Sequence, residues 1–149
     1  MMLPHGMDGQ GPEHSSARME RFLQMTDDDP ELVLNDQDIK LQVRKTNMQI
    51  VQCSTSANYF MALRRQMRKD FRKPLIMFNS KKLLRFKQAC SSINEFGENI
   101  IFQRLYDEAF PDKLVSPEKI KKVIICSGQF YYDLLERRTK LGVNVLYIS

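Results

Sequence analysis

Short apolar runs separated by amphipathic segments dominate the hydrophobic pattern of this chain. The runs at 48–53, 75–78, 122–126 and 143–148 consist mostly of Ile, Val, Leu, Met and Phe, which predicts strands that are buried on both faces. A weaker run at 100–102 predicts a further short strand inside loop-like sequence. Because such strands alternate with helical segments, the pattern predicts an α/β fold with parallel sheets and flanking helices.

The first third of the chain gives weaker signals. Residues 5–16 contain three glycines and Pro12, which predicts a loop. A helix is expected after Pro12, because apolar residues recur at helical spacing as far as Leu23. Residues 27–47 show no sustained period, and they predict an exposed acidic insertion.

Two later helices are better marked. Ser54 or Thr55 is expected to cap a helix whose apolar residues recur with helical spacing through Met67. A second helix is predicted over 129–141 and should stop at Gly142. Because this second helix lies between two predicted strands, it indicates a right-handed crossover unit. So few helices cannot cover both faces of two sheets, which predicts that the chain is a fragment of a larger α/β protein.

Positive charge is concentrated between residues 64 and 87, here called the basic segment. The whole chain carries 23 Lys and Arg against 18 Asp and Glu, a formal charge of +5. The basic segment alone contains ten basic residues and the single acid Asp70, a local charge of +9. Such a segment can bind phosphates, nucleic acid or an acidic partner, and it can equally be a solvated helix face with an inter-subunit surface. Within it, 81–86 predicts a basic turn or short helix.

Other classes of protein are disfavoured by features that the sequence lacks. No apolar run approaches the roughly 18 residues that a membrane-spanning helix needs, so no membrane span is expected. The first ten residues resemble neither a secretory signal nor a transit peptide. The three widely spaced cysteines form no zinc-binding pair and favour a reducing compartment. The aromatic residues of the basic segment lack the glycine-framed motif of an RNA-binding sheet, so nucleic acid is not expected as a partner.

The two histidines of the chain are the main candidates for chemistry. His5, beside Gly6 at the edge of a predicted parallel sheet, lies where α/β proteins place ligands, and it could bind a carboxylate or shuttle a proton. Glu13, His14 and Ser15 cluster at a predicted helix start, where backbone N–H groups favour anions. Two loop histidines satisfied by local hydrogen bonds are an equally open interpretation. Two histidines with distant acids predict no metal site.

Four blocks of sequence carry a family resemblance, and they occur in this order: LPHGMDGQGPEHSSARMERFLQM, CSTSANYFMALRRQ, FRKPLIMFNSKKLLRF and IICSGQFYYDLLERR. They resemble the thiamine diphosphate-dependent 2-oxoglutarate dehydrogenases and cover nearly the whole chain. The resemblance implies incomplete pieces of two transketolase-like domains. Residues 1–90 would be the end of the pyrimidine-binding domain, and residues 91–149 the start of the carboxy-terminal domain.

The resemblance also implies an activity for the parent protein, which is oxidative decarboxylation of 2-oxoglutarate in the tricarboxylic acid cycle. The cofactors would be thiamine diphosphate and magnesium, and the succinyl group would pass to a lipoyl group on a succinyltransferase subunit. The implied assembly is a homodimer in the mitochondrial matrix. The Gly-Asp-Gly motif that holds the magnesium diphosphate in the family is missing here. We therefore expect no cofactor-binding residues in this chain, and no turnover by it alone.

The resemblance assigns roles to particular residues. His5 matches the active-site histidine of the family, which would contact the substrate and stabilise developing negative charge. Five further residues would support the loop that faces the substrate, namely Gly6, Gln10, Glu13, His14 and Ser15. Arg64 and Arg65 match an Arg-Arg-Gln motif for which a structural or interface role is expected.

One departure from the family pattern leaves the substrate open. The family usually reads Pro-Lys-Ser-Leu-Leu-Arg-His where this chain reads Ser80 to Phe86. Phe86 cannot form the hydrogen bonds of a histidine, and relatives that act on 2-oxoadipate also tend to carry an apolar residue there. A 2-oxoadipate dehydrogenase and a non-catalytic basic interaction domain therefore remain as alternatives, while the acidic block at 27–30 favours 2-oxoglutarate.

Overall fold

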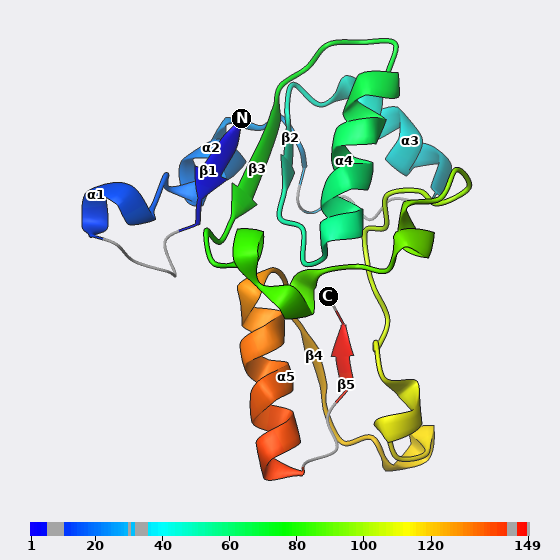
Figure 1. The fold of residues 1–149 in the computed structure, drawn as a ribbon. Helices are drawn as coiled ribbons and strands as arrows, with labels where there is room; N and C mark the ends of the chain where they lie inside the picture. Colours follow the sequence, from blue (N-terminus) through cyan, green and yellow to red (C-terminus); the bar gives the residue numbers. More distant parts are fainter. Residues whose placement is uncertain (6–10, 30, 32–35, 143–145, 149) are drawn as a thin grey trace. The chain divides into compact units, whose positions relative to one another are not determined.

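The chain forms two compact units, each containing a parallel sheet (Figure 1). A computed structural model describes residues 1–5, 11–29, 31, 36–142 and 146–148. The first unit consists of residues 1–52 and 69–81, and the second unit consists of residues 53–68 and 82–149. The predicted α/β fold with parallel sheets and flanking helices is confirmed.

The sheet of the first unit has three parallel strands, and the last of them in sequence lies at its centre. β1 (Met2–Pro4) and β2 (Gln49–Val51) both pair with β3 (Leu75–Asn79). The predicted strands at 48–53 and 75–78 are thus confirmed. The first four residues of β3 are buried, with at most 8% exposure, as expected for a central parallel strand. β1 is a further strand, too short to show a period in the sequence.

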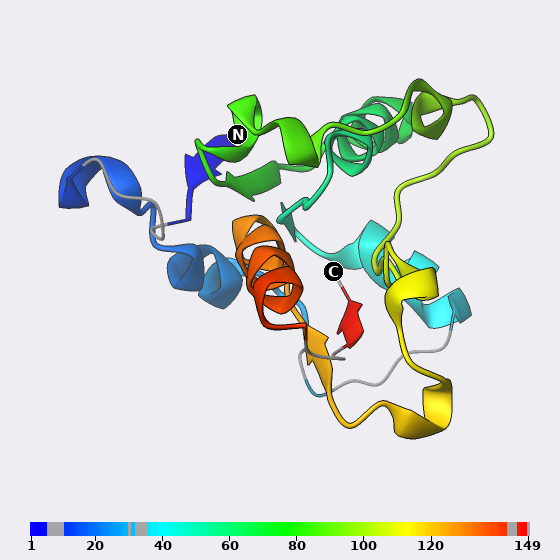
Figure 2. The same cartoon turned by 60° about the horizontal axis from the view of Figure 1, so that its bottom comes forward.

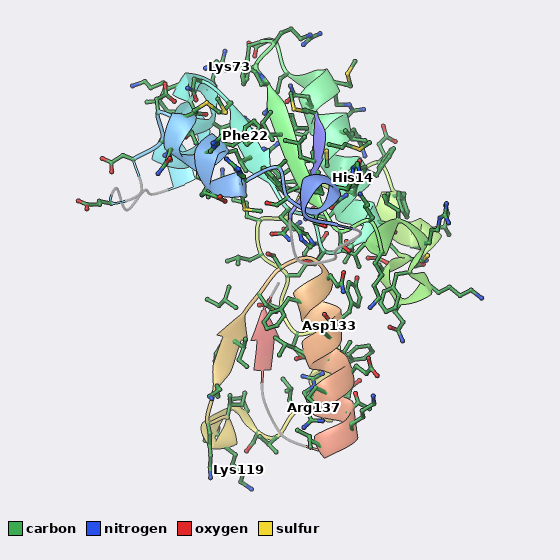
Figure 3. All side chains as sticks on the ribbon, turned by 90° about the vertical axis from the view of Figure 1, so that its left-hand side faces the viewer. His14, Phe22, Lys73, Lys119, Asp133 and Arg137 are labelled. Carbon is green, nitrogen blue, oxygen red and sulfur yellow. The ribbon has the colours of Figure 1, made fainter. Side chains whose placement is uncertain are left out.

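The helix predicted after Pro12 is two helices. α1 (Pro12–Ser15) and α2 (Met19–Met25) are separated at Arg18, whose φ of 60° places it in the left-handed region. No right-handed helix can continue through that conformation, so the prediction of one helix was wrong. α2 packs on the sheet through Phe22, which is labelled in Figure 3. Its ring meets that of Phe78 edge-on at a centroid distance of 5.6 Å.

The predicted acidic insertion over 27–47 contains a helix, α3 (Asp36–Lys45), so the expectation of irregular structure there was wrong. The end of α3 is bonded to a distant lysine. Lys73 donates to the carbonyl of Arg44, to that of Lys45 at 2.9 Å and to that of Thr46 at 2.7 Å. An ammonium at the end of a helix satisfies carbonyls that have no partner within the helix.

The helices of the second unit follow the sequence signals closely. α4 (Ser56–Arg68) begins after Thr55, whose hydroxyl accepts a hydrogen bond from the backbone N–H of Asn58 at 3.1 Å. α5 (Gln129–Leu141) ends at Gly142, which has a φ of 62° and donates to the Arg138 carbonyl at 2.9 Å. Within the described residues, no helix has the length and apolar character needed to cross a membrane.

The sheet of the second unit has two parallel strands, β4 (Val123–Ile125) and β5 (Leu146–Ile148), with α5 between them in sequence. Figures 1 and 2 show α5 running alongside both strands. Val123 and Ile125 are 51% and 74% exposed, so the prediction of a strand buried on both faces is wrong for β4. Ile124 points the other way, into a cluster around Tyr131 and Tyr132.

The strand predicted at 100–102 is absent from the structure. The backbone after it is bonded by a side chain instead of a neighbouring strand. The Asn58 amide accepts from the N–H of Gln103 and donates to its carbonyl, both at 3.1 Å. The side-chain amide of asparagine has an oxygen that accepts hydrogen bonds and a nitrogen that donates them. It can therefore bond the backbone N–H and carbonyl of one residue, as a neighbouring strand would.

Among the described residues, five single-turn 3-10 helices lie between β3 and β4: η1 (Leu83–Arg85), η2 (Lys87–Ala89), η3 (Ile93–Phe96), η4 (Pro111–Lys113) and η5 (Pro117–Lys119). η1 confirms the short helix expected within 81–86. Ser54 ties α5 to the start of α4, because its hydroxyl accepts from Gly128 N at 2.9 Å and its carbonyl accepts from the Tyr132 hydroxyl at 2.7 Å.

Candidate functional site

The carboxyl edge of the sheet in the first unit gathers the candidate chemistry. The carboxyl ends of parallel strands meet at one edge, and α/β proteins bind ligands there. His5 directly follows β1, and Ser80 and Lys81 directly follow β3. Pro4 is paired with Asn79, so the two strands end at the same level. The predicted position of His5 at a sheet edge is therefore confirmed.

The backbone of His5 is held from two sides. On one side it continues β1, and on the other it forms an antiparallel bridge with Ser16. The next residue strengthens this contact, because Ala17 N donates to the Pro4 carbonyl at 3.0 Å. His5 is half-buried, so its imidazole has limited but real access to solvent. A histidine in such a position can donate a hydrogen bond to an anionic group.

The other predicted residues of the loop lie partly outside the described part of the chain. Gly6 and Gln10 fall within residues 6–10, which the structure does not describe. Glu13 lies in α1, but its side chain is likewise outside the description. Ser15 is buried, and its hydroxyl donates to the Gly11 carbonyl. Ser15 thus makes a contact within its own turn, and its role in supporting the loop stays a prediction.

His14 takes part through its backbone. Its side chain is exposed on α1 (Figure 3), while its carbonyl accepts a hydrogen bond from the Lys81 ammonium at 2.9 Å. Lys81 therefore joins the end of β3 to the segment that carries His14. The sequence indicated Lys81 only as part of a basic turn. Its place directly after a central strand was the signal that could have identified it.

Several cations of the basic segment contact carbonyls and rings elsewhere in the same chain. The Arg64 guanidinium donates to the carbonyls of Gly97 and Glu98 at 3.1 and 2.8 Å. The Arg65 guanidinium lies 4.5 Å from the centre of the Phe102 ring, a cation–π contact. The structural role expected for these two arginines agrees with these contacts. Several cations of the segment are thus engaged by carbonyls and rings of the chain itself.

Phe86, the main departure from the family pattern, belongs to the core of the second unit. Its ring meets that of Tyr132 edge-on at a centroid distance of 5.4 Å. It also packs against a buried cluster that includes Ala89 and Tyr131. At this position an apolar ring fills space in a core without burying a polar group. A histidine there would bury ring nitrogens that need hydrogen-bond partners.

The second unit also contains a cavity of about 980 Å³ along α5, and a buried ion pair contributes to its wall. The Arg138 guanidinium binds the Glu108 carboxylate through two bonds, of 2.6 and 2.9 Å. Their side chains are only 8% and 4% exposed. Burial, with the nearby Glu108 charge second, raises the pKa of Tyr131 beside them. No local pattern in the sequence indicates this pair, because its members are 30 residues apart.

The cysteines are distributed as buried and exposed thiols. Burial raises the pKa of the Cys53 thiol to about 11, and burial also raises that of Cys126. Cys90 is exposed. Among the described residues, no three His, Cys, Asp or Glu side chains come close enough together to hold a metal ion.

Comparison with known proteins places both parts of the chain in recognised families. Residues 1–87 match the family described as "Transketolase, pyrimidine binding domain", and residues 90–148 match the family described as "2-oxoglutarate dehydrogenase C-terminal".

Individual relatives match over nearly the whole chain. A protein of Dictyostelium discoideum named "2-oxoglutarate dehydrogenase, mitochondrial" is 50% identical over 145 residues, covering 97% of this chain and 14% of the relative. "2-oxoglutarate dehydrogenase E1 component" of Brucella anthropi is 47% identical over 153 residues, covering 99% of this chain and 14% of the relative. The protein of the same name from Brucella ovis is 46% identical over 153 residues, with the same coverage. The chain therefore spans about one seventh of the length of these relatives.

Proposed function

We propose a function for this chain on the ground that it belongs, over residues 1–87, to the transketolase pyrimidine-binding domain family. The chain acts as part of a 2-oxoglutarate dehydrogenase. The reaction is the thiamine diphosphate-dependent oxidative decarboxylation of 2-oxoglutarate, followed by transfer of the succinyl group to a lipoyl group. The observation that carries this proposal is the 50% identity over 97% of the chain to a protein named for that activity.

Within this reaction, His5 is the residue of the chain that faces the substrate. Its position at the carboxyl edge of the parallel sheet supports this role, as does the backbone bridge that fixes it there. Bound thiamine diphosphate supplies the nucleophilic carbon and accepts the electron pair released with carbon dioxide. The imidazole N–H donates a hydrogen bond to the oxygen on which negative charge grows. Gly6, Gln10, Glu13, His14 and Ser15 are proposed to shape the loop around it.

The cofactor itself is proposed to be bound mainly by other parts of the protein. Among the described residues, no three His, Cys, Asp or Glu side chains are grouped closely enough to hold a metal ion, and the Gly-Asp-Gly motif is missing from the sequence. What the described residues offer at the sheet edge is cationic and hydrogen-bond-donating, which suits a carboxylate-bearing substrate.

The partners and location follow as further parts of the proposal. The protein acts as a homodimer with a lipoyl-bearing succinyltransferase subunit in the mitochondrial matrix. The name of the Dictyostelium relative supports a mitochondrial location, although the Brucella relatives are bacterial proteins of similar identity. We also propose that the boundary between the two domain pieces lies between residues 90 and 91.

The test is the variant His5→Ala in the whole protein that contains this chain. Turnover of 2-oxoglutarate, measured with an artificial electron acceptor, should fall about 10²–10³-fold, or about 2.7–4 kcal/mol, because one donor to developing charge is lost. Thiamine diphosphate affinity and thermal stability should change little. His14→Ala is the comparison and should lower turnover less than His5→Ala, because alanine keeps the backbone carbonyl that Lys81 binds. Wild-type turnover by His5→Ala, with the cofactor still bound, would contradict the proposed role.

The alternative substrate is 2-oxoadipate, which is favoured by the apolar side chain of Phe86. Its packing against Tyr132 supports a structural role for the ring, and this keeps 2-oxoglutarate as the first choice. The ratio of kcat/KM for the two acids distinguishes the substrates directly. A non-catalytic basic domain is less well supported, because cations such as Arg64 are bonded within the chain.

A further inference from the structure

A side-chain contact joins the end of β3 to the segment after His5. Lys81 lies two residues beyond β3, and its ammonium donates to the His14 carbonyl, 67 residues earlier in the sequence. The bond is 2.9 Å long and is charge-assisted, because the donor carries a full positive charge. The contact lies within the first unit, as does the sheet that ends beside it.

The segment that Lys81 binds is the one that holds His5. From His14 the chain runs through Ser15 to Ser16, which forms the backbone bridge with His5. The next residue, Ala17, donates to the Pro4 carbonyl at 3.0 Å. Because Pro4 is also paired with Asn79 of β3, the contacts form a closed circuit. The circuit runs from β3 through Lys81 to the segment 14–17. It continues from that segment to His5 and returns through β1 to β3.

Lys81 contributes a side-chain link to this circuit, whereas the contacts described on either side of His5 are made by the backbone. We propose that Lys81 is a positioning residue for His5, fixing the segment 14–17 and through it the orientation of the imidazole toward the substrate. This inference rests on the proposed function of His5. Lys81 acts through the His14 carbonyl and needs no contact with substrate or cofactor.

The neighbouring lysine provides a matched control. Lys82 has the same charge and lies one residue away, but its ammonium is 3.9 Å from the Asp133 carboxylate. Both side chains of this pair are about half exposed, so the pair contributes little. The Lys82 ammonium also lies 5.4 Å from the centre of the Phe86 ring, in a cation–π contact within the second unit. A general effect of removing positive charge would appear equally in variants of Lys81 and Lys82.

The experiment compares Lys81→Met, Lys81→Arg and Lys82→Met in the whole protein, with 2-oxoglutarate and an artificial electron acceptor. Lys81→Met should lower kcat about tenfold with little change in KM, because the binding groups remain while the donor to developing charge is misplaced. Lys81→Arg should recover most of the activity, since a guanidinium also donates to carbonyls. Lys82→Met should match the wild type. Thermal midpoint and thiamine diphosphate affinity should stay unchanged in all three.

A double variant tests whether Lys81 acts through His5. In the His5→Ala background, Lys81→Met should cause no further loss of kcat, because there is no imidazole left to position. An additive tenfold loss would overturn the proposal and indicate a direct contact of Lys81 with the substrate. Wild-type activity of Lys81→Met, while His5→Ala is impaired, would overturn the positioning role alone. Wild-type activity of His5→Ala would overturn both this inference and the proposed role of His5.

Discussion

The two units of the chain achieve a buried interior by different means. In the first unit, β3 is buried along Leu75 to Phe78, and Phe22 of α2 covers the Phe78 ring. In the second unit, an apolar cluster around Tyr131 and Tyr132 is accompanied by buried polar bonds, because Glu108 binds Arg138 and Ser54 binds Tyr132. The strands differ most. β3 is a central strand with a neighbour on both sides, whereas β4 belongs to a sheet of two strands and is half open to solvent.

The largest effect is expected from the centre of the first unit. Phe78→Ala should lower the free energy of unfolding by about 3–5 kcal/mol, because the ring is fully buried and leaves a cavity. Ile125→Ala on β4 is the matched control, with an expected change within about 0.5 kcal/mol because that side chain is 74% exposed. Denaturant unfolding of both variants measures the difference. Equal losses would mean that the two units do not differ in how they bury apolar surface.

A somewhat smaller effect is expected from the ion pair of the second unit. Arg138→Met should cost about 3 kcal/mol, because it leaves the Glu108 carboxylate buried without its cation. Adding Glu108→Leu to that variant should restore much of the loss, since the pair is then replaced by apolar groups of similar size. Denaturant unfolding again provides the measurement. A double variant no more stable than Arg138→Met would show that the pair itself, and not its burial, stabilises this unit.

The smallest effect concerns high pH, and it should be confined to the second unit. All five tyrosines and all three cysteines lie there. Burial raises the pKa of Cys53 from 9.0 to about 11 and that of Tyr132 from 10.0 to about 12. The unfolded chain therefore loses these protons first, so stability should be constant below pH 9 and should fall as the pH rises toward 11–12.

Denaturant unfolding at pH 8 and at pH 10.5 tests this pH dependence, with Tyr132→Phe as the comparison. The variant loses the bond to the Ser54 carbonyl at both pH values, but its stability should fall less steeply with pH than that of the wild type. An unchanged slope would show that Tyr132 is no source of the alkaline effect.

The sequence predicted the elements whose signals are local. α5 has the predicted bounds of 129–141, because Gly142 supplies the left-handed residue that ends it. β2 and β3 were recognised by their apolar runs. α3 was not, because its apolar residues Ile39, Leu41 and Val43 alternate as they would in a strand. At 100–102 the pattern was that of a strand, but strand formation requires a partner strand, and the backbone directly after it, at Gln103, is bonded by the side-chain amide of Asn58.

The candidate site shows the same difference between local patterns, which the sequence reveals, and contacts between distant segments. His5 could be placed at a sheet edge because a glycine-rich loop beside an apolar run is a local pattern. Lys81 could not be connected to His14, because the contact spans 67 residues and depends on which strands are neighbours. The pairing of Glu108 with Arg138 is hidden for the same reason. Contacts between distant segments become visible only when the strand order is known.

The bonds of Lys73 at the end of α3 have a consequence for how the basic segment presents its charge. An ammonium ion in water is surrounded by oxygen atoms, and here three carbonyl oxygens occupy that first shell (Figure 3 labels Lys73). Backbone carbonyl oxygens thus replace water molecules around the ammonium ion, while its charge still contributes to the electrostatic field at longer range. An approaching polyanion would feel the positive charge of Lys73 at a distance but would find its three donors already saturated at contact. Lys73 should therefore attract a polyanion without donating hydrogen bonds to it.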